Sequence, residues 1–123
     1  MANMRRKLFY KKKKSVDYLK YKNEALKFVC QRVNHYNQLY DFKFNRISIR
    51  NQRTRWGSCS KKGNLNFNYR LLILPQHLAD YVIIHELCHL KEMNHSQGFW
   101  SLVARVFPNY LEIRKKLRKV RIL

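Results

Sequence analysis

Hydrophobic residues recur at steps of three and four positions through residues 16–40, which is the spacing of one face of an α-helix. Tyr21, Ala25, Val29 and Val33 belong to this series. Aromatic and aliphatic side chains share the face, so it is broad enough to pack against a core. The pattern predicts a long amphipathic helix over these residues.

After residue 45 the pattern changes to an alternation of apolar and polar residues, which is typical of half-buried strands. The segment from Lys61 to Asn64 predicts the turn of an antiparallel hairpin between the second and third strands. Gly57 inside a strand indicates a bulge or a close approach to the backbone. The three predicted strands are residues 46–51 with Ile47 and Ile49, residues 54–60, and a third strand with Leu65, Phe67 and Tyr69.

Helical signals return in the second half of the chain. Pro75 suits the first position of a helix that is expected to end between Lys91 and Asn94, where Asn94 tolerates a positive φ. Ser96 can cap the next helix. A last helix is predicted over residues 109–120. Its predicted inner residues are Leu111, Leu117 and Val120, and its predicted outer residues are Arg114, Lys115, Lys116, Arg118 and Lys119.

These elements predict an α+β fold, with one domain over residues 15–123 and a basic N-terminal arm over residues 1–14. A small antiparallel sheet is expected to pack on the helix that begins at Pro75. Helices at the two ends of the chain are expected to complete the core. A length of 123 residues suits a single domain of this kind.

Composition adds a strong positive charge, because 27 Lys and Arg stand against 7 Asp and Glu, a formal net charge of +20. That charge predicts attraction to phosphates, nucleic acid or acidic surfaces. The three cysteines, Cys30, Cys59 and Cys88, form no C-x-x-C pair and no disulfide framework, so a reducing, cytoplasmic location is expected. No apolar stretch approaches the ~18 residues that cross a bilayer, so no membrane span is expected.

The candidate chemistry lies in the helix after Pro75, where His85-Glu86-Leu87-Cys88-His89 forms an H-E-x-x-H motif. Residues four apart on a helix share one face, so His85 and His89 can present ring nitrogens to one zinc ion. Glu86 is then placed to take a proton from a water molecule at that ion. Charged and polar groups in an apolar helix need partners, and one bound zinc ion would supply them.

Catalytic zinc usually has three protein ligands, so the motif needs one more. His95 follows His89 by six residues and can fold back to the metal if the helix ends between the two. Glu92 lies seven residues after His85 and would share its face if the helix continued. Glu112, on the predicted last helix, is a further alternative. His95 is the preferred third ligand.

Two blocks of sequence resemble the YgjP-like metallopeptidase family, which is related to the SprT-like and WLM domains. The blocks are Arg55-Trp56-Gly57-Ser58-Cys59 and the run from His85-Glu86-Leu87-Cys88-His89 to Asn94-His95-Ser96, and the resemblance covers about residues 45–120. It implies a zincin-like α+β fold and metal binding by His85, His89 and His95. It also implies that Glu86 is the catalytic carboxylate.

The predicted function is therefore a zinc-dependent hydrolase, with a metallopeptidase as the main interpretation. Arg55, Trp56 and Ser58 are candidate substrate-binding residues, because their strand could pair with an extended peptide. Two alternatives stay open: a metal-dependent nucleotide phosphohydrolase, and a nucleic-acid-associated SprT-like protein with non-specific binding through its basic surface. The residues that stabilise the oxyanion are also open, and the candidates are Tyr69, Arg70, His77 and Tyr110.

Overall fold

The computed structural model describes residues 15–122, so the predicted basic arm, residues 1–14, lies outside the described residues. The described chain combines helices with a three-stranded sheet, which confirms the predicted α+β fold. The long helix predicted over residues 16–40 is present. In chain order the elements are α2 (Ser15–Tyr40), β1 (Arg46–Arg50), β2 (Gly57–Cys59), β3 (Asn64–Asn68), the 3-10 helix η1 (Tyr69–Ile73), α3 (Gln76–Cys88), α4 (Gln97–Ala104) and α5 (Tyr110–Arg118).

The sheet has the strand order β1-β3-β2. β2 and β3 form the predicted antiparallel hairpin, and its turn holds Gly63 at a φ of 83°. β1 pairs with β3 in parallel, with Ile49 opposite Phe67, so the sheet is mixed and the expectation of an antiparallel sheet is wrong for β1. An alternating pattern reveals a strand and its buried face, whereas the direction of its neighbour depends on how the connecting segment crosses the sheet.

The sheet is apolar on one face and polar on the other. Leu65 and Phe67 on the central strand β3 are fully buried, and Asn66 between them points to the other face. β3 ends at Asn68. Tyr69 was predicted as part of the strand and instead begins η1. Asn68 makes this change of direction, because its side chain accepts a hydrogen bond from the Arg70 backbone N–H at 3.0 Å.

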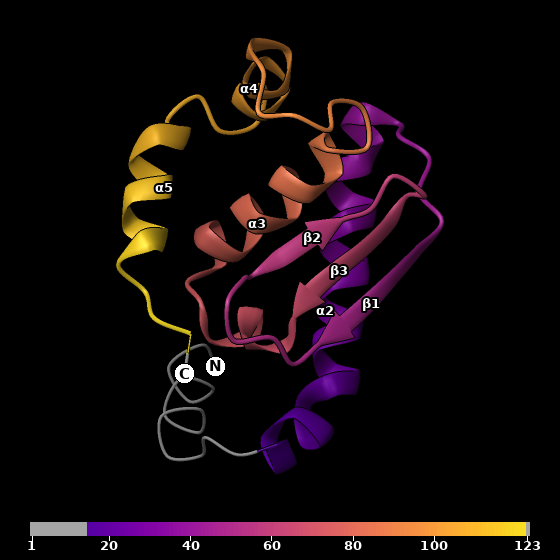
Figure 1. Cartoon of the computed structure of the whole chain (residues 1–123), viewed down its shortest axis with the longest axis vertical. Coiled ribbons are helices and arrows are strands. Elements are labelled where there is room, and N and C mark those ends of the chain that lie inside the picture. Colours follow the sequence, from indigo (N-terminus) through magenta and orange to yellow (C-terminus); the bar gives the residue numbers. More distant parts are fainter. Residues whose placement is uncertain (1–14, 123) are drawn as a thin grey trace.

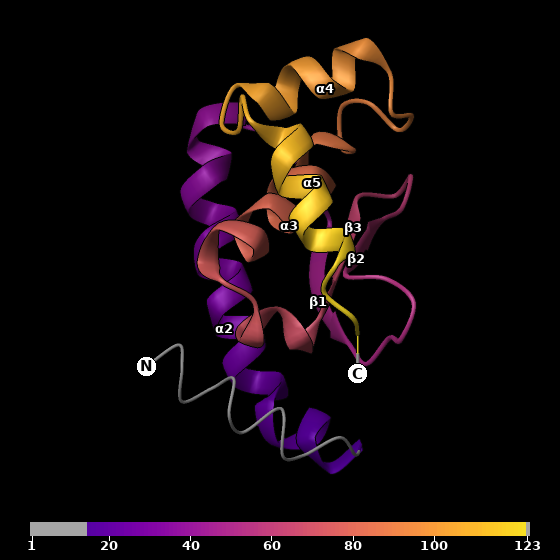
Figure 2. The same ribbon diagram turned by 90° about the vertical axis from the view of Figure 1, so that its left-hand side faces the viewer.

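Helix α3 lies at the centre of the molecule. It contacts α2, β2, β3, α4 and α5, and Figures 1 and 2 show it between α2, the sheet and α5. β2, one of the two edge strands, is the strand nearest to α3 in Figure 1. A partly buried ion pair joins the two core helices, since Arg32 of α2 donates two hydrogen bonds to the carboxylate of Asp80 on α3. Tyr36 donates a third, at 2.8 Å.

Three predicted details of the helices differ from the structure. Pro75 is the residue before α3 rather than its first residue, and α3 ends at Cys88 rather than between Lys91 and Asn94. In α5, Leu111 was predicted to face the core but is 59% exposed, and Ile113 is the buried residue instead. The apolar residues of that short helix are too few to fix its face from periodicity alone. No helix among residues 15–122 is long and apolar enough to cross a membrane.

Candidate metal centre

The first two histidines of the motif lie at the carboxyl end of α3. His85 is in the last turn, and His89 is the first residue after the helix. Its φ of −67° and ψ of −17° are still helical, so the two residues keep the one-turn relationship that the motif requires. Their ring centroids are 4.8 Å apart.

A tight turn after His89 brings His95 back to the same place. The backbone N–H groups of Leu90 and Lys91 donate to carbonyls three residues earlier, which closes the helix end. Ser96 then begins α4 as its N-cap, as predicted, and its hydroxyl accepts a hydrogen bond from the Phe99 N–H at 3.2 Å. Asn94 does not have the positive φ expected of it, and Asp41 is the only described non-glycine residue that does.

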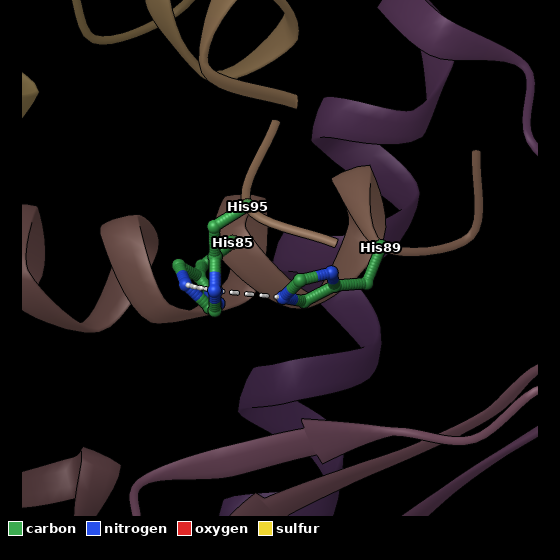
Figure 3. Close-up of side chains that lie close together, drawn as sticks. All are labelled: His85, His89 and His95. Atoms are coloured by element: carbon green, nitrogen blue, oxygen red, sulfur yellow. Dashed lines mark hydrogen bonds between the residues drawn. The ribbon is translucent and has the colours of Figure 1, made fainter. Parts of the chain in front are cut away.

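The three predicted histidines converge through their Nε2 atoms (Figure 3). The Nε2 of His95 lies 3.1 Å from that of His85 and 3.2 Å from that of His89. His89 is buried, His85 is half-buried and His95 is exposed, so the cluster opens to solvent on the His95 side. Partial burial lowers the pKa of His95, and the neighbouring rings of His85 and His89 lower it further.

Hydrogen bonds on the far side of two rings determine which nitrogen is free. The Nδ1 of His89 lies 2.9 Å from the carbonyl oxygen of Glu92, which can only accept, so this Nδ1 carries the proton. The Nδ1 of His85 lies 3.2 Å from Oε2 of Glu86, and an ionised carboxylate there likewise accepts. Both rings therefore present an Nε2 lone pair to His95, which is the orientation of metal-ligating histidines.

Glu86 lies beside this cluster and is only 6% exposed. Its side chain points toward the edge strand β2, where Gly57 leaves space for it. A Cβ atom at residue 57 would lie 3.1 Å from the Glu86 Cγ, 3.2 Å from its Oε2 and 3.1 Å from the carbonyl oxygen of Asn66. The close approach predicted for Gly57 is thus present, and the group that approaches is the carboxylate of the motif.

A pocket of about 380 Å³ opens next to His85 and Glu86. α3 contributes Tyr81 and Val82 to it, and the chain around β2 contributes Trp56 and Gly57. The remaining wall comes from α5 and the segment after it, with the lining residues Arg114, Leu117, Arg118, Val120 and Ile122, and Thr54 completes the rim.

The comparisons with known proteins agree with this geometry. A family model described as YgjP-like, metallopeptidase domain, matches residues 4–120. The chain belongs to the YgjP-like metallopeptidase family. The match begins well before the residue at which the sequence resemblance was expected to begin, so α2 is part of the family domain.

Two solved structures have a similar fold. The metallopeptidase zymogen of Pyrococcus abyssi abylysin is 28% identical with a TM-score of 0.65, and the match covers 72% of this chain and 90% of that chain. The metallopeptidase zymogen of Methanocaldococcus jannaschii jannalysin is 24% identical with a TM-score of 0.65, and the match covers 74% of this chain and 94% of that chain. No curated protein matches the chain.

Membership in a metallopeptidase family makes this protein a hydrolase and implies a divalent metal ion. The histidine cluster fits such an ion. Two nitrogen ligands at ~2.05 Å from a tetrahedral zinc ion lie about 3.3 Å apart, close to the 3.1 and 3.2 Å separations of the Nε2 atoms. Without a cation, the His95 Nε2–H could donate to only one of its two neighbours, which would leave the Nε2 lone pair of the other without a partner.

The two alternative third ligands of this YgjP-like chain lie elsewhere. The carboxylate of Glu92 accepts a hydrogen bond from the Ser96 hydroxyl at 3.2 Å, and only the Glu92 backbone contacts a histidine of the cluster. Glu112 is exposed in the first turn of α5. Neither belongs to the group of potential ligand atoms formed by the three histidines.

The candidate substrate-binding residues occupy different positions around β2. Trp56 lines the pocket. Ser58 lies within β2, and its hydroxyl accepts a hydrogen bond from the Asn66 side chain at 3.4 Å. The Arg55 side chain is exposed and does not line the pocket, although its carbonyl accepts a hydrogen bond from Asn68.

None of the four candidate oxyanion residues lines the pocket. Arg70 is buried and bonds to the Gln52 carbonyl, and His77 is exposed in the first turn of α3. Tyr69 is buried in the core. Tyr110 comes nearest, because it stacks on Trp100, whose ring lies against that of His95.

Sequence reasoning missed three polar residues of the pocket: Tyr81, Arg114 and Arg118. Helical spacing could have revealed Tyr81, because it lies one turn before His85 on the same helix face. Arg114 and Arg118 were assigned to the outer face of the last helix. Arg114 is instead half-buried, and although Arg118 is exposed as expected, both arginines line the pocket on the side of α5 that faces α3.

Proposed function

We propose that this protein is a metallopeptidase that binds one zinc ion through His85, His89 and His95. The observation that supports the proposal is the convergence of the three Nε2 atoms, with that of His95 3.1 Å from His85 and 3.2 Å from His89 and all potential ligand atoms within 4.8 Å of one another. Three protein ligands leave a fourth position open, which is the arrangement of catalytic zinc sites. When bound, zinc would polarise the scissile carbonyl and lower the pKa of a water molecule.

Glu86 is the general base in this proposal. Its carboxylate takes a proton from the attacking water as the new C–O bond forms, and it returns that proton to the amide nitrogen as the C–N bond breaks. Burial of Glu86 and its contact with His85 at 3.2 Å support this role, because both restrict the carboxylate to one position. Gly57 supports it further by leaving the space that the carboxylate occupies.

The peptide substrate is proposed to lie along β2. This strand pairs with β3 on one side and is an edge of the sheet on the other. Trp56 and Gly57, at the start of the strand, line the pocket beside Glu86. An extended peptide can add to such an edge through backbone hydrogen bonds, which would position its scissile bond without regard to side-chain sequence.

The substitution Glu86→Gln tests the catalytic role. It keeps the shape of the side chain and removes the base, so zinc content and melting temperature should be retained while peptide turnover falls by about 10²- to 10⁴-fold. Glu92→Gln makes the same chemical change on a carboxylate outside the histidine cluster, and it should keep turnover near the wild-type value. Near-wild-type turnover by zinc-loaded Glu86→Gln would refute the mechanism.

The third ligand is tested by metal affinity. His95→Ala should lower zinc affinity strongly, whereas Glu92→Ala and Glu112→Ala should leave one equivalent of zinc bound to the purified protein. The opposite result would mean that a carboxylate completes the site. Elemental analysis after equilibration with a competing chelator gives the measurement.

The nucleotide phosphohydrolase and nucleic-acid alternatives rest on the net charge of +20 alone. They remain untested predictions, as does the cytoplasmic location. A peptide substrate is preferred because the family is a metallopeptidase family.

A further inference from the structure

Two arginines face the pocket without acidic partners. Arg114 and Arg118 lie one turn apart on α5, and both line the pocket beside Glu86. Neither forms an ion pair with any residue in the described part of the chain. The guanidinium of Arg114 packs on the Trp100 ring, 4.6 Å from its centroid, which fixes its position and leaves its hydrogen-bond donors available.

Tyr81, which lines the same pocket, carries a buried hydroxyl. Tyr81 is 3% exposed, yet its hydroxyl has no hydrogen-bond partner among residues 15–122. Burial raises the pKa of Tyr81 to about 12, and Arg114 and Arg118 both act on it in the opposite direction. The phenol therefore stays protonated at neutral pH and is available as a hydrogen-bond donor. Buried polar groups without a partner are uncommon in folded proteins and point to a missing ligand.

The remaining walls are apolar. Trp56, Val82 and Leu117 line the pocket together with these donors and Glu86. A volume of about 380 Å³ is within the range of sites for small ligand groups. The pocket thus matches a group with a short apolar stem and a negatively charged end. Glu86 in the same pocket disfavours a doubly charged anion such as phosphate, because like charges repel.

We propose that this pocket binds a carboxylate of the peptide substrate, carried by a residue next to the scissile bond. Arg114, Arg118 and Tyr81 are the residues that bind it. The carboxylate comes either from an Asp or Glu side chain or from the free C-terminus of the peptide. This inference rests on the proposed function, because His85 and Glu86 line the same pocket.

Cleavage of a peptide library tests the inference. Zinc-loaded wild type is incubated with peptides of random sequence, half with free and half with amidated C-termini, and the cut sites are read by mass spectrometry. Asp or Glu should be enriched at one position beside the cut in both halves if a side chain is bound. Cuts near the terminus, confined to the free peptides, would identify the terminal carboxylate.

Arg118→Gln and Lys115→Gln form a matched pair, because both remove one positive charge from an exposed position of α5 and only Arg118 lines the pocket. Arg118→Gln should reduce the acidic-over-neutral ratio of kcat/KM by about ten- to a hundredfold, the range for a lost hydrogen bond between charged groups. Lys115→Gln should leave that ratio unchanged. Lys115→Gln should also cleave neutral peptides at the wild-type rate.

The outcomes separate the two proposals. Peptide cleavage with no preference for an acidic side chain or for a free C-terminus, or with a preference that Arg118→Gln retains, would overturn the carboxylate pocket and leave the metallopeptidase proposal standing. If no peptide is cleaved, the metallopeptidase proposal fails. The carboxylate pocket is then tested by calorimetry, which compares the affinities of the protein for N-acetylglutamate and N-acetylglutamine. Equal affinities would overturn the carboxylate pocket. A tenfold higher affinity for N-acetylglutamate that is lost in Arg118→Gln would support it.

Discussion

Replacement of Gly57 by alanine tests the contact between strand β2 and Glu86, the proposed catalytic carboxylate. The added Cβ would lie 3.1 Å from Cγ and 3.2 Å from Oε2 of Glu86, a few tenths of an ångström closer than ordinary contacts. It would also lie 3.1 Å from the carbonyl oxygen of Asn66, which belongs to the paired strand β3 and cannot move alone. Overpacking of this kind costs about 1–3 kcal/mol.

Glu86 is the group that can yield, so the carboxylate should move away from β2. A misplacement on the order of 1 Å in a catalytic group lowers turnover about 10²-fold. We therefore expect Gly57→Ala to keep its zinc, to lose about 10- to 100-fold in kcat, and to melt roughly 4–12 °C below wild type. Turnover with a quenched-fluorescence peptide, zinc content and thermal unfolding followed by circular dichroism give the three values.

Gly98→Ala is the matched control. Its Cβ would meet Oε1 of Glu92 at 2.9 Å, but that atom is the end of a flexible side chain, and the site is helical. The control should retain turnover and lose little stability, because alanine favours the helix. Wild-type kcat and melting temperature in Gly57→Ala would show that residue 57 does not position Glu86, and the proposed role of the close approach would be wrong.

Three further predictions concern stability. Removal of zinc by a chelator should lower the melting temperature, since a ligand at a hundredfold excess over its Kd stabilises the native state by about 2.7 kcal/mol; an unchanged curve after confirmed metal loss would argue against a native zinc site. Asp80→Asn should cost about 2–4 kcal/mol in urea unfolding, because Arg32 loses its partner, and Arg32→Met/Asp80→Leu should recover much of it. Burial raises the pKa of Cys88 from 9.0 to about 11. The contribution of the protonated thiol to the free energy of unfolding is therefore intact below pH 9 and falls as pH rises toward 11. Between pH 8 and 11 the free energy of unfolding should accordingly fall by about 2 kcal/mol less in Cys88→Ala than in wild type. Parallel curves of unfolding free energy against pH for the two proteins would contradict this.

Local patterns predicted most elements because each has a local physical cause. The apolar spacing of α2 follows from the face that packs on the core, and the cap at Ser96 follows from the donors at the start of α4. The direction of β1 relative to β3 has no such local cause. It depends on the path of the segment between β1 and β2, and no alternating pattern records that path.

The pocket was harder to predict than the histidines. His85 and His89 are brought together by one turn of helix, so their spacing in the sequence is sufficient. Arg114 and Arg118 reach the pocket only because α5 packs against α3, a tertiary contact between segments about 30 residues apart. Charged residues on an amphipathic helix are usually placed in solvent, and functional sites are where that rule fails.

The choice between His95 and Glu92 depends on where α3 ends. If the helix continued through Glu92, that carboxylate would lie two turns above His85 on the same face. The helix ends at Cys88, and the turn that follows directs the Glu92 carbonyl to His89 and its carboxylate to Ser96. Residues 89–95 contain neither glycine nor proline, and Asn94, the ending signal that the sequence offers, lies six residues beyond the observed end of the helix at Cys88. The packing of α4 on α3 brings His95 to the cluster. This tertiary contact favours His95 over Glu92 as the third ligand, a choice that the sequence alone could not make.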